Sequence, residues 1–167
     1  MIHERKGAMR KLWECKDWSY FIKQECRTGI RLRFDKDVDP EVKRSCKEFV
    51  SWLRTQYEFP IRVPIYFKAA KNIVSLDGQM ASAAFWGPYD KSQEPYIRIA
   101  VGDYQELLAE RGKDNALAAN LGAIAHELSH YYQWIKDYNF DVKKCERQAK
   151  YYAREILYDY AETREHP

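Results

Sequence analysis

The hydrophobic and polar positions of this 167-residue chain change period several times, and each change predicts a different element. Residues 30–34 and 96–101 alternate apolar and polar side chains, as half-buried strands do. Two further strands are expected at 61–67 and 80–86. Within the former, Pro64 indicates an edge position or a bulge, because proline cannot donate to a strand ladder.

Helical periodicity of about 3.6 residues alternates with these strands. It is found in five segments, at about 9–27, 39–56, 103–110, 114–135 and 141–160. Asp39 followed by Pro40 is a strong helix start, with the aspartate as N-cap. Asp103 and Asp114 are the expected N-caps of the third and fourth helices, and Gly112 separates these two. We expect the aromatic face of the first helix to dock on the domain.

The succession of elements predicts a single α+β domain over residues 1–167 without a linker or repeat. Residues 1–27 form an N-terminal helical extension in this prediction. Residues 28–112 contribute the sheet and its helices, and residues 113–160 form a pair of helices. A chain of this length can bury a sizeable core.

Composition narrows the classes of protein that fit. Apolar residues make up 46% and aromatic residues 15%, which argues against disorder. With 28 basic and 25 acidic residues the net charge is +3, so composition gives no electrostatic case for nucleic acid. No stretch approaches the roughly 20 apolar residues of a membrane span, and the N-terminus has no leader pattern. The four scattered cysteines are expected to be reduced, which indicates a cytoplasmic protein.

The segment 114–135 carries the motif His126-Glu127-x-x-His130. At about 100° per residue the two histidines lie about 40° apart on one helix face, where their imidazoles can bind one metal ion. Glu127 can reach a water molecule bound to that ion. The opposite face is apolar and is expected to pack, whereas the histidine side has small residues at Ala119 and Ala123. The apolar residues are Leu117, Leu121, Ile124, Leu128, Tyr131 and Ile135.

A catalytic zinc site usually has three protein ligands and keeps a fourth position open. The expected third ligand is Glu146, because it falls inside the apolar stripe of the last helix and a buried carboxylate requires a cation. A salt bridge from Glu146 to Lys150 would serve the same purpose and is the alternative. The other acceptors near the motif are less well placed; they are Asp137, Asp141, Glu162 and His166.

These motifs resemble zinc metallopeptidases of the gluzincin type, in which the histidine motif is followed by a glutamate on a later helix. Residues 60–160 are most similar to the small ImmA/IrrE-type peptidase domains, including the pattern Glu146-x-x-Ala149-x-x-x-Ala153. The resemblance implies a minimal zincin-like domain. Its small, mostly antiparallel sheet of three to four strands would pack on the active-site helix and a C-terminal helix.

Related patterns are absent. Gln133 and Lys136 replace the glycine and histidine that a metzincin needs, and the cysteine ribbon of SprT-like proteases is missing. Larger gluzincins often place an aspartate where this chain has Lys150, so the residue that orients a histidine ligand stays unassigned.

The first hypothesis is therefore a zinc-dependent metallopeptidase acting on a protein or peptide substrate. His126, His130 and Glu146 would hold Zn2+, and Glu127 would act as general base on a metal-activated water. The strand at 80–86 could pair with an extended substrate. An electrophilic helper for the oxyanion is expected among four residues, which are Tyr131, Tyr151, Tyr152 and His166.

Two other hypotheses stay open. A catalytically silent metal-binding module, regulatory or partner-binding, could use the same residues with a fourth protein ligand closing the site. Alternatively, the motif is fortuitous in a nucleic-acid or partner-binding domain. In that case a basic face is expected on the helix at 39–56, with Lys43, Arg44, Lys47 and Arg54.

Overall fold

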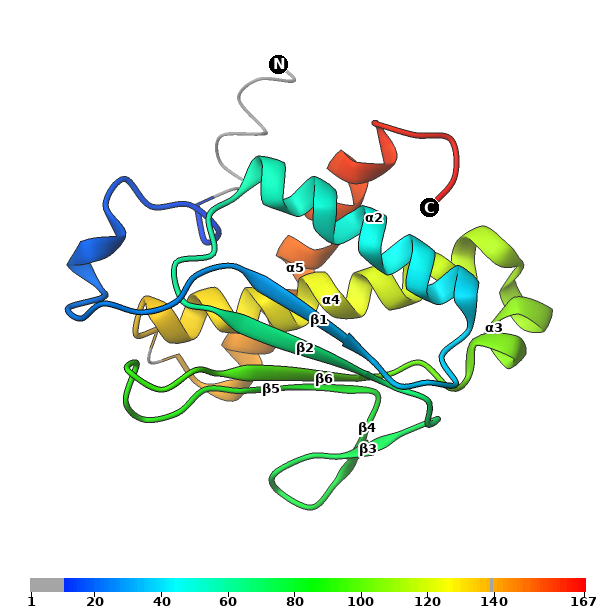
Figure 1. Ribbon diagram of the computed structural model, residues 1–167, viewed down its shortest axis with the longest axis horizontal. Helices are drawn as coiled ribbons and strands as arrows, with labels where there is room; N and C mark the ends of the chain where they lie inside the picture. The colour runs from blue at the N-terminus through cyan, green and yellow to red at the C-terminus, as the bar shows by residue number, and fades with distance from the viewer. Residues whose placement is uncertain (1–10, 139) are drawn as a thin grey trace.

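The computed structural model describes residues 11–138 and 140–167 (Figure 1). The protein is an α+β domain, as predicted, with a four-stranded sheet and a separate two-stranded one. In chain order its elements are η1 (Trp18–Tyr20), β1 (Ile30–Phe34), α2 (Pro40–Gln56), β2 (Val63–Lys68), β3 (Ile73–Val74), β4 (Met80–Ala81), β5 (Ala83–Trp86), β6 (Tyr96–Ala100), α3 (Tyr104–Arg111), α4 (Lys113–Ile135) and α5 (Val142–Ala161).

The main sheet has the strand order β1-β2-β6-β5 and is mixed. β1 and β6 both run parallel to β2, and only β5 is antiparallel to its neighbour. The expectation of a mostly antiparallel sheet is therefore wrong. The reason lies in the connections, because α2 carries the chain back to the starting end of the sheet between β1 and β2. β5 and β6, in contrast, follow one another as a hairpin.

Pro64 lies in the central strand β2, and not at an edge or bulge as the sequence suggested. The backbone N–H of Val63 bonds to Gly29 beside β1, so the next residue along the strand faces β6. Pairing with β6 begins only at Ile65, opposite Ile97. The missing N–H of Pro64 thus falls just before that ladder starts, and no hydrogen bond of the ladder is lost.

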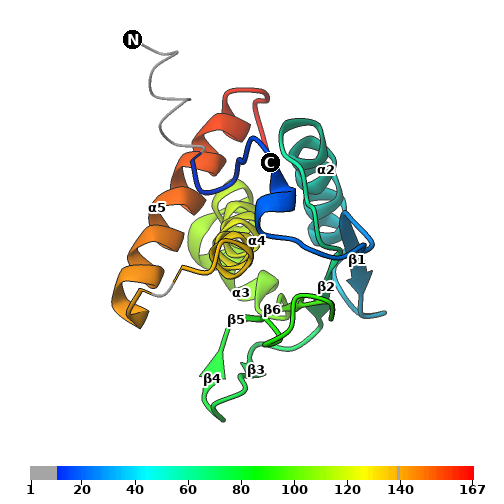
Figure 2. The same ribbon diagram turned by 90° about the vertical axis from the view of Figure 1, so that its left-hand side faces the viewer.

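The three long helices form one layer over one face of the sheet, and the β3–β4 hairpin projects on the opposite side (Figure 1). Seen end-on, α4 lies between α5 and α2 (Figure 2). All six residues of the predicted apolar face of α4 are buried. α2 begins as predicted, since the Asp39 carboxylate accepts a hydrogen bond from the Glu41 backbone N–H at 2.8 Å. α4 is thus the central element of the domain.

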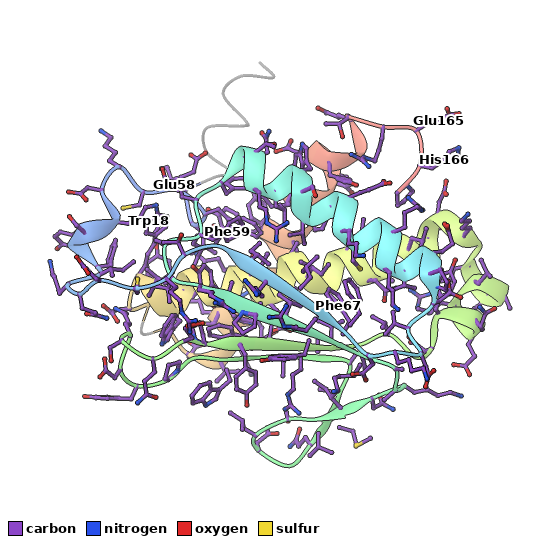
Figure 3. All side chains as sticks on the ribbon, in the orientation of Figure 1. Trp18, Glu58, Phe59, Phe67, Glu165 and His166 are labelled. Carbon is purple, nitrogen blue, oxygen red and sulfur yellow. The ribbon has the colours of Figure 1, made fainter. Side chains whose placement is uncertain are left out.

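The predicted N-terminal helix is wrong for the part of it that is described, residues 11–27; residues 9–10 lie outside the described residues. This segment contains only the single turn η1, which Asp17 caps through the Ser19 backbone N–H. Trp13 is fully buried and its Nε1 donates to Ser129 Oγ at 3.1 Å. Tertiary contacts of individual aromatic residues therefore override helix propensity in this segment. Its aromatic side chains nevertheless dock on the domain, as expected. Trp18 and Phe59 lie at the same end of the molecule (Figure 3).

The junction between α3 and α4 is tighter than predicted. Gly112 adopts a φ of +81° and ends α3, and it is also the N-cap of α4. Asp114 therefore lies in the first turn of α4 and is not its N-cap, as was expected. Asp103 does precede α3, but its side chain makes no capping hydrogen bond. The positive φ of Gly112 changes the chain direction at a single residue, so α4 can follow α3 without a loop.

Two expectations from composition can be compared with the described residues. Within residues 11–138 and 140–167, no helix combines the length and apolarity that crossing a membrane requires. All four cysteines are free thiols, and Cys46 is buried on the apolar face of α2. Burial raises the pKa of the Cys46 thiol to about 12, so this cysteine is a packing residue, as predicted.

Candidate metal centre

The three predicted ligands meet between α4 and α5. His126 Nε2 lies 3.0 Å from one carboxylate oxygen of Glu146, and His130 Nε2 lies 2.9 Å from the other. One potential ligand atom from each residue lies within 4.8 Å of the other two. Two imidazole nitrogens and a carboxylate oxygen form a donor set that fits zinc and other divalent cations.

A short turn after α4 makes this convergence possible. The chain reverses between Ile135 and Asp141, where Asp137 adopts a positive φ of 53°. Asp141 then caps α5, its side chain accepting from the Lys144 backbone N–H at 2.8 Å. The first turns of α5 therefore lie beside the histidine face of α4, with Glu146 opposite both imidazoles.

Glu146 occupies the predicted place, but the reason given for it is wrong. Its side chain is 54% exposed, and Val142 one turn earlier is 78% exposed. The first turns of α5 border the cleft and do not pack on the core. The apolar side of this helix is therefore buried only from Ala149 onward. The acidic residue of α5 that is buried is instead Asp159, which the sequence placed off the stripe. The Glu146 carboxylate lies against the two histidine rings, and no ion pair between it and Lys150 is found within the described residues.

Gln133 orients His130, a role that the sequence left unassigned. The Gln133 Nε2 donates to the Cys145 carbonyl at 3.0 Å and to Gln148 Oε1 at 2.8 Å. Since a carbonyl can only accept, the amide oxygen must face His130 Nδ1, 2.8 Å away. His130 Nδ1 is therefore the donor, and its Nε2 presents a lone pair toward Glu146. The spacing of three residues on one helix was the signal that could have indicated this contact.

His126 lies in a setting that favours the neutral ring. Burial lowers the pKa of its imidazole, and so does the neighbouring His130, whereas Glu146 acts in the opposite direction. The ring centroids of the two histidines are 4.9 Å apart, which explains their mutual effect. A neutral imidazole is the form that binds a metal, because protonation would occupy the donor nitrogen.

Glu127 is buried, with only 6% of its surface exposed. Burial, and to a smaller extent the negative charge of Glu146, raise the pKa of its carboxyl to about 8. A hydrogen bond from the backbone of Phe85, in strand β5, opposes this shift. Glu127 therefore connects the metal centre to the edge of the sheet, and it is poised to exchange a proton near neutral pH.

The site opens into a cleft of about 940 Å³ between α4, α5 and β5. Its α4 wall carries small residues beside the histidines, including Ala119, Gly122 and Ala123, as predicted for the first and last of these. The facing wall comprises residues 81–85, from the end of β4 into β5. Trp134 also lines the cleft, and its Nε1 donates to the Pro88 carbonyl at 2.8 Å. A side chain at Gly87 would collide with this indole, with a Cβ 2.6 Å from Trp134 Cδ1.

β5 lies at the edge of the main sheet and keeps one side of its backbone unpaired by other strands. Ala100 donates its N–H to the Ser82 carbonyl directly opposite, so even-numbered residues of this strand bond toward β6. The backbone groups of Ala83 and Phe85 consequently point away from β6, and of these the Phe85 N–H is taken up by the Glu127 carboxylate. This arrangement can accept an additional extended chain.

The remaining candidates from the sequence lie elsewhere. The Tyr131 hydroxyl is buried and hydrogen-bonded to the backbone of Ile61. His166 pairs with Asp114 at 2.8 Å, on the C-terminal tail at the other end of the molecule from Trp18 (Figure 3). Neither Tyr151 nor Tyr152 lines the cleft, whereas Tyr138, which the sequence did not single out, does.

Of the rival third ligands, Asp137 pairs with Lys91 at 2.7 Å and Asp141 caps α5. Glu162 forms the C-terminal end of that helix, far along the chain from Glu146. The predicted trio is thus the one that the fold brings together.

In comparisons with known proteins, no family model matches this chain and no curated protein matches its sequence. The chemistry of the site therefore has to be argued from its own residues.

Proposed function

We propose that the protein is a zinc-dependent metallopeptidase, with His126, His130 and Glu146 as ligands and Glu127 as general base. The observation that carries the proposal is the convergence of these three ligands at the floor of an open cleft bordered by a free strand edge. A bound zinc ion would supply Lewis-acid activation of water and of the scissile carbonyl.

The substrate of this proposal is an extended peptide segment. The backbone groups of Ala83 and the carbonyl of Phe85 would bond to it as an added strand, and this pairing would place one peptide bond above the histidines. The small side chains at Ala119 and Ala123 leave room for the substrate along α4. Hydrogen bonds between the substrate backbone and β5 would hold the substrate in one register. The carbonyl of the scissile bond would therefore be oriented before the reaction.

Glu127 would take a proton from the attacking water and deliver it to the leaving amine. Its position next to the cleft and its pKa of about 8 suit a group that gains and loses a proton in one cycle. Neutralising the charge of Glu146 with a divalent cation would remove one cause of the raised pKa, which favours the carboxylate form needed at the start.

The catalytically silent alternative needs a fourth protein ligand. Within residues 11–138 and 140–167, the group of residues able to hold a metal contains only His126, His130 and Glu146. Glu146 is more than half exposed, on the side of the site that faces the cleft. Both observations support an open coordination position and therefore favour the peptidase over the silent module.

The test uses the full-length protein loaded with zinc. Metal content per chain is measured after dialysis, and hydrolysis is followed by mass spectrometry on a mixture of ten-residue peptides. We expect about one zinc per chain for the wild type and for Glu127→Gln, with hydrolysis reduced by roughly 10²–10⁴-fold in the variant. Glu110→Gln, an exposed glutamate of α3, is the matched control and should change neither quantity. Undiminished hydrolysis by Glu127→Gln would contradict the assigned base.

A further inference from the structure

A second pocket, of about 560 Å³, adjoins the metal centre on its α5 side. It shares His126 and Glu146 with the main cleft, so any substrate held at the metal also borders this pocket. Three basic side chains of α5 line its wall, namely Lys143, Arg147 and Lys150. The exposed Val142 adds an apolar spot to the same wall.

These three cations have no anionic partner of their own, as is also true of other described basic residues such as Arg31 and Lys43, but they are gathered in one pocket beside the metal centre. Arg44 pairs with Glu41 and Glu48, and Lys71 pairs with Glu106. Lys143, Arg147 and Lys150, in contrast, form no ion pair with any described residue. The one carboxylate among them, Glu146, is engaged with the two histidines. With three cations against the single carboxylate of Glu146, the pocket carries net positive charge.

Part of this placement is unfavourable for the helix itself, because Lys143 lies in its first turn and Arg147 follows four residues later. The first turn of α5 contains no acidic residue, and Lys143, Lys144, Arg147 and Lys150 all lie within its first three turns. Cations near the N-terminus oppose the helix dipole, and cations four residues apart repel each other. Residues that bind a ligand often depart from such local preferences, here the preference against basic residues at a helix N-terminus.

From these observations we infer that the α5 pocket binds a carboxylate of the substrate next to the scissile bond. This inference rests on the proposed peptidase function and adds a substrate class to it, namely acidic peptides. The carboxylate can belong to an aspartate or glutamate side chain or to the C-terminus of the peptide, since both present the same two oxygens to the basic groups. Along an extended substrate, alternate side chains point to one side, so the side chain on that side nearest the metal would face the α5 pocket.

The experiment uses a library of ten-residue peptides in which each position in turn is Glu, Gln, Lys or Leu. Every peptide is made both with a free C-terminal carboxylate and with a C-terminal amide. Cleavage by the zinc-loaded protein is mapped by mass spectrometry and aligned on the bond that breaks. We expect one aligned position, or the free C-terminus, to raise kcat/KM at least about fivefold over its uncharged counterpart. Side-chain recognition retains this preference in the amidated peptides, and C-terminal recognition loses it.

Variants tie the preference to the pocket. Arg147→Gln/Lys150→Gln should remove it, and Lys150→Glu should shift it toward Lys at the same position. Lys144→Gln removes the same charge from the same helix but outside the pocket, and it should keep the preference. Equal cleavage of Glu and Gln peptides, or a preference that survives the double substitution, would overturn the inference.

A binding measurement separates this inference from the proposed function. Fluorescence anisotropy is measured for labelled Glu and Gln peptides with zinc-loaded Glu127→Gln protein and with the same protein carrying the double substitution. If no peptide is hydrolysed by the wild type, the peptidase proposal fails. The pocket assignment then stands if the Glu peptide binds more tightly and loses that advantage with the double substitution, and it falls if the two peptides bind alike.

Discussion

The two faces of α4 carry opposite kinds of side chain, although they belong to the same 23-residue helix. One face is fully buried and holds the domain together through residues such as Leu121, Ile124 and Leu128. The other face is small and polar and lines the cleft with Ala123, His126 and other residues. The comparison shows that the cleft residues stand on a helix whose other face is packed in the core. The core packing therefore fixes the positions of the cleft residues, although these residues do not contribute to that packing. Substitutions on the two faces should therefore separate stability from chemistry.

The largest effect is expected on the cleft face. Replacing His130 with alanine removes one ligand nitrogen and leaves two donors, too few to retain zinc. We expect the metal content to fall from about one ion per chain to background, and the gain in Tm on adding zinc to disappear. His166→Ala is the matched control, because His166 lies outside the site, and it should bind zinc like the wild type. Full metal content in His130→Ala would refute the assigned ligand set.

A similarly large effect, but on stability, is expected on the packed face. Leu128→Ala leaves a cavity in the core and should lower the free energy of unfolding by about 2–5 kcal/mol. Urea denaturation measures this loss, and zinc affinity determined well below the transition should stay unchanged. Ala119→Ser on the cleft face serves as control and should shift stability by less than about 0.5 kcal/mol. A strong loss of zinc affinity in folded Leu128→Ala would show that the faces are not independent.

An intermediate effect is expected where the two faces meet, at Gln133. Gln133→Ala frees the His130 ring and should weaken zinc binding about 10–100-fold, equivalent to about 1.4–2.7 kcal/mol. Competition with a chromophoric chelator gives the affinity. Gln148→Ala removes only one of the partners of Gln133 and leaves its bond to the Cys145 carbonyl, so its effect should be smaller. Equal effects of the two substitutions would argue against an orienting role for Gln133.

A smaller effect is expected at Ser129, on the side of α4 that Trp13 covers. Ser129→Ala removes the acceptor of the Trp13 Nε1 hydrogen bond and leaves a buried donor unpaired. We expect a loss of about 1–2 kcal/mol in the free energy of unfolding, with zinc content unchanged. Ser19→Ala, at an exposed position of the N-terminal segment, is the comparison and should cost less.

The smallest effect is expected at the start of α4, away from both faces, where His166 pairs with Asp114. The hydrogen bond and the charge of Asp114 raise the pKa of the His166 imidazole. A raised pKa means that the folded state binds the proton more tightly, so the pair stabilises fully below about pH 6.5 and weakens as the pH rises through the folded pKa. The difference in Tm between wild type and His166→Gln should therefore be larger at pH 5.5 than at pH 8.5, and an equal difference would exclude the pair.

Much of the helical layer could be predicted from the sequence. The apolar face of α4 follows from local periodicity, and the start of α2 follows from a capping signal. Such signals act within one element, and tertiary context did not override them in these cases.

Features that depend on distant partners could not be predicted in this way. The parallel pairing of β1 with β2 depends on how α2 crosses the sheet, and the exposure of Glu146 depends on the overhang of α5 above the cleft. The N-terminal segment follows the same rule, since its aromatic side chains are positioned by Tyr57 and Tyr132 rather than by their neighbours in the chain. Glu146 does lie opposite the two histidines, although the argument from burial that selected it is wrong.

The burial of Trp13 has a practical consequence for anyone who wishes to trim this protein. A shortened chain that begins at β1 would look complete by its regular elements, yet it would uncover the rings of Tyr57 and Tyr132 against which Trp13 packs. An apolar surface of that kind invites self-association. Crystallisation or engineering efforts should therefore retain the irregular segment ahead of β1, because its Trp13 side chain covers part of the hydrophobic core.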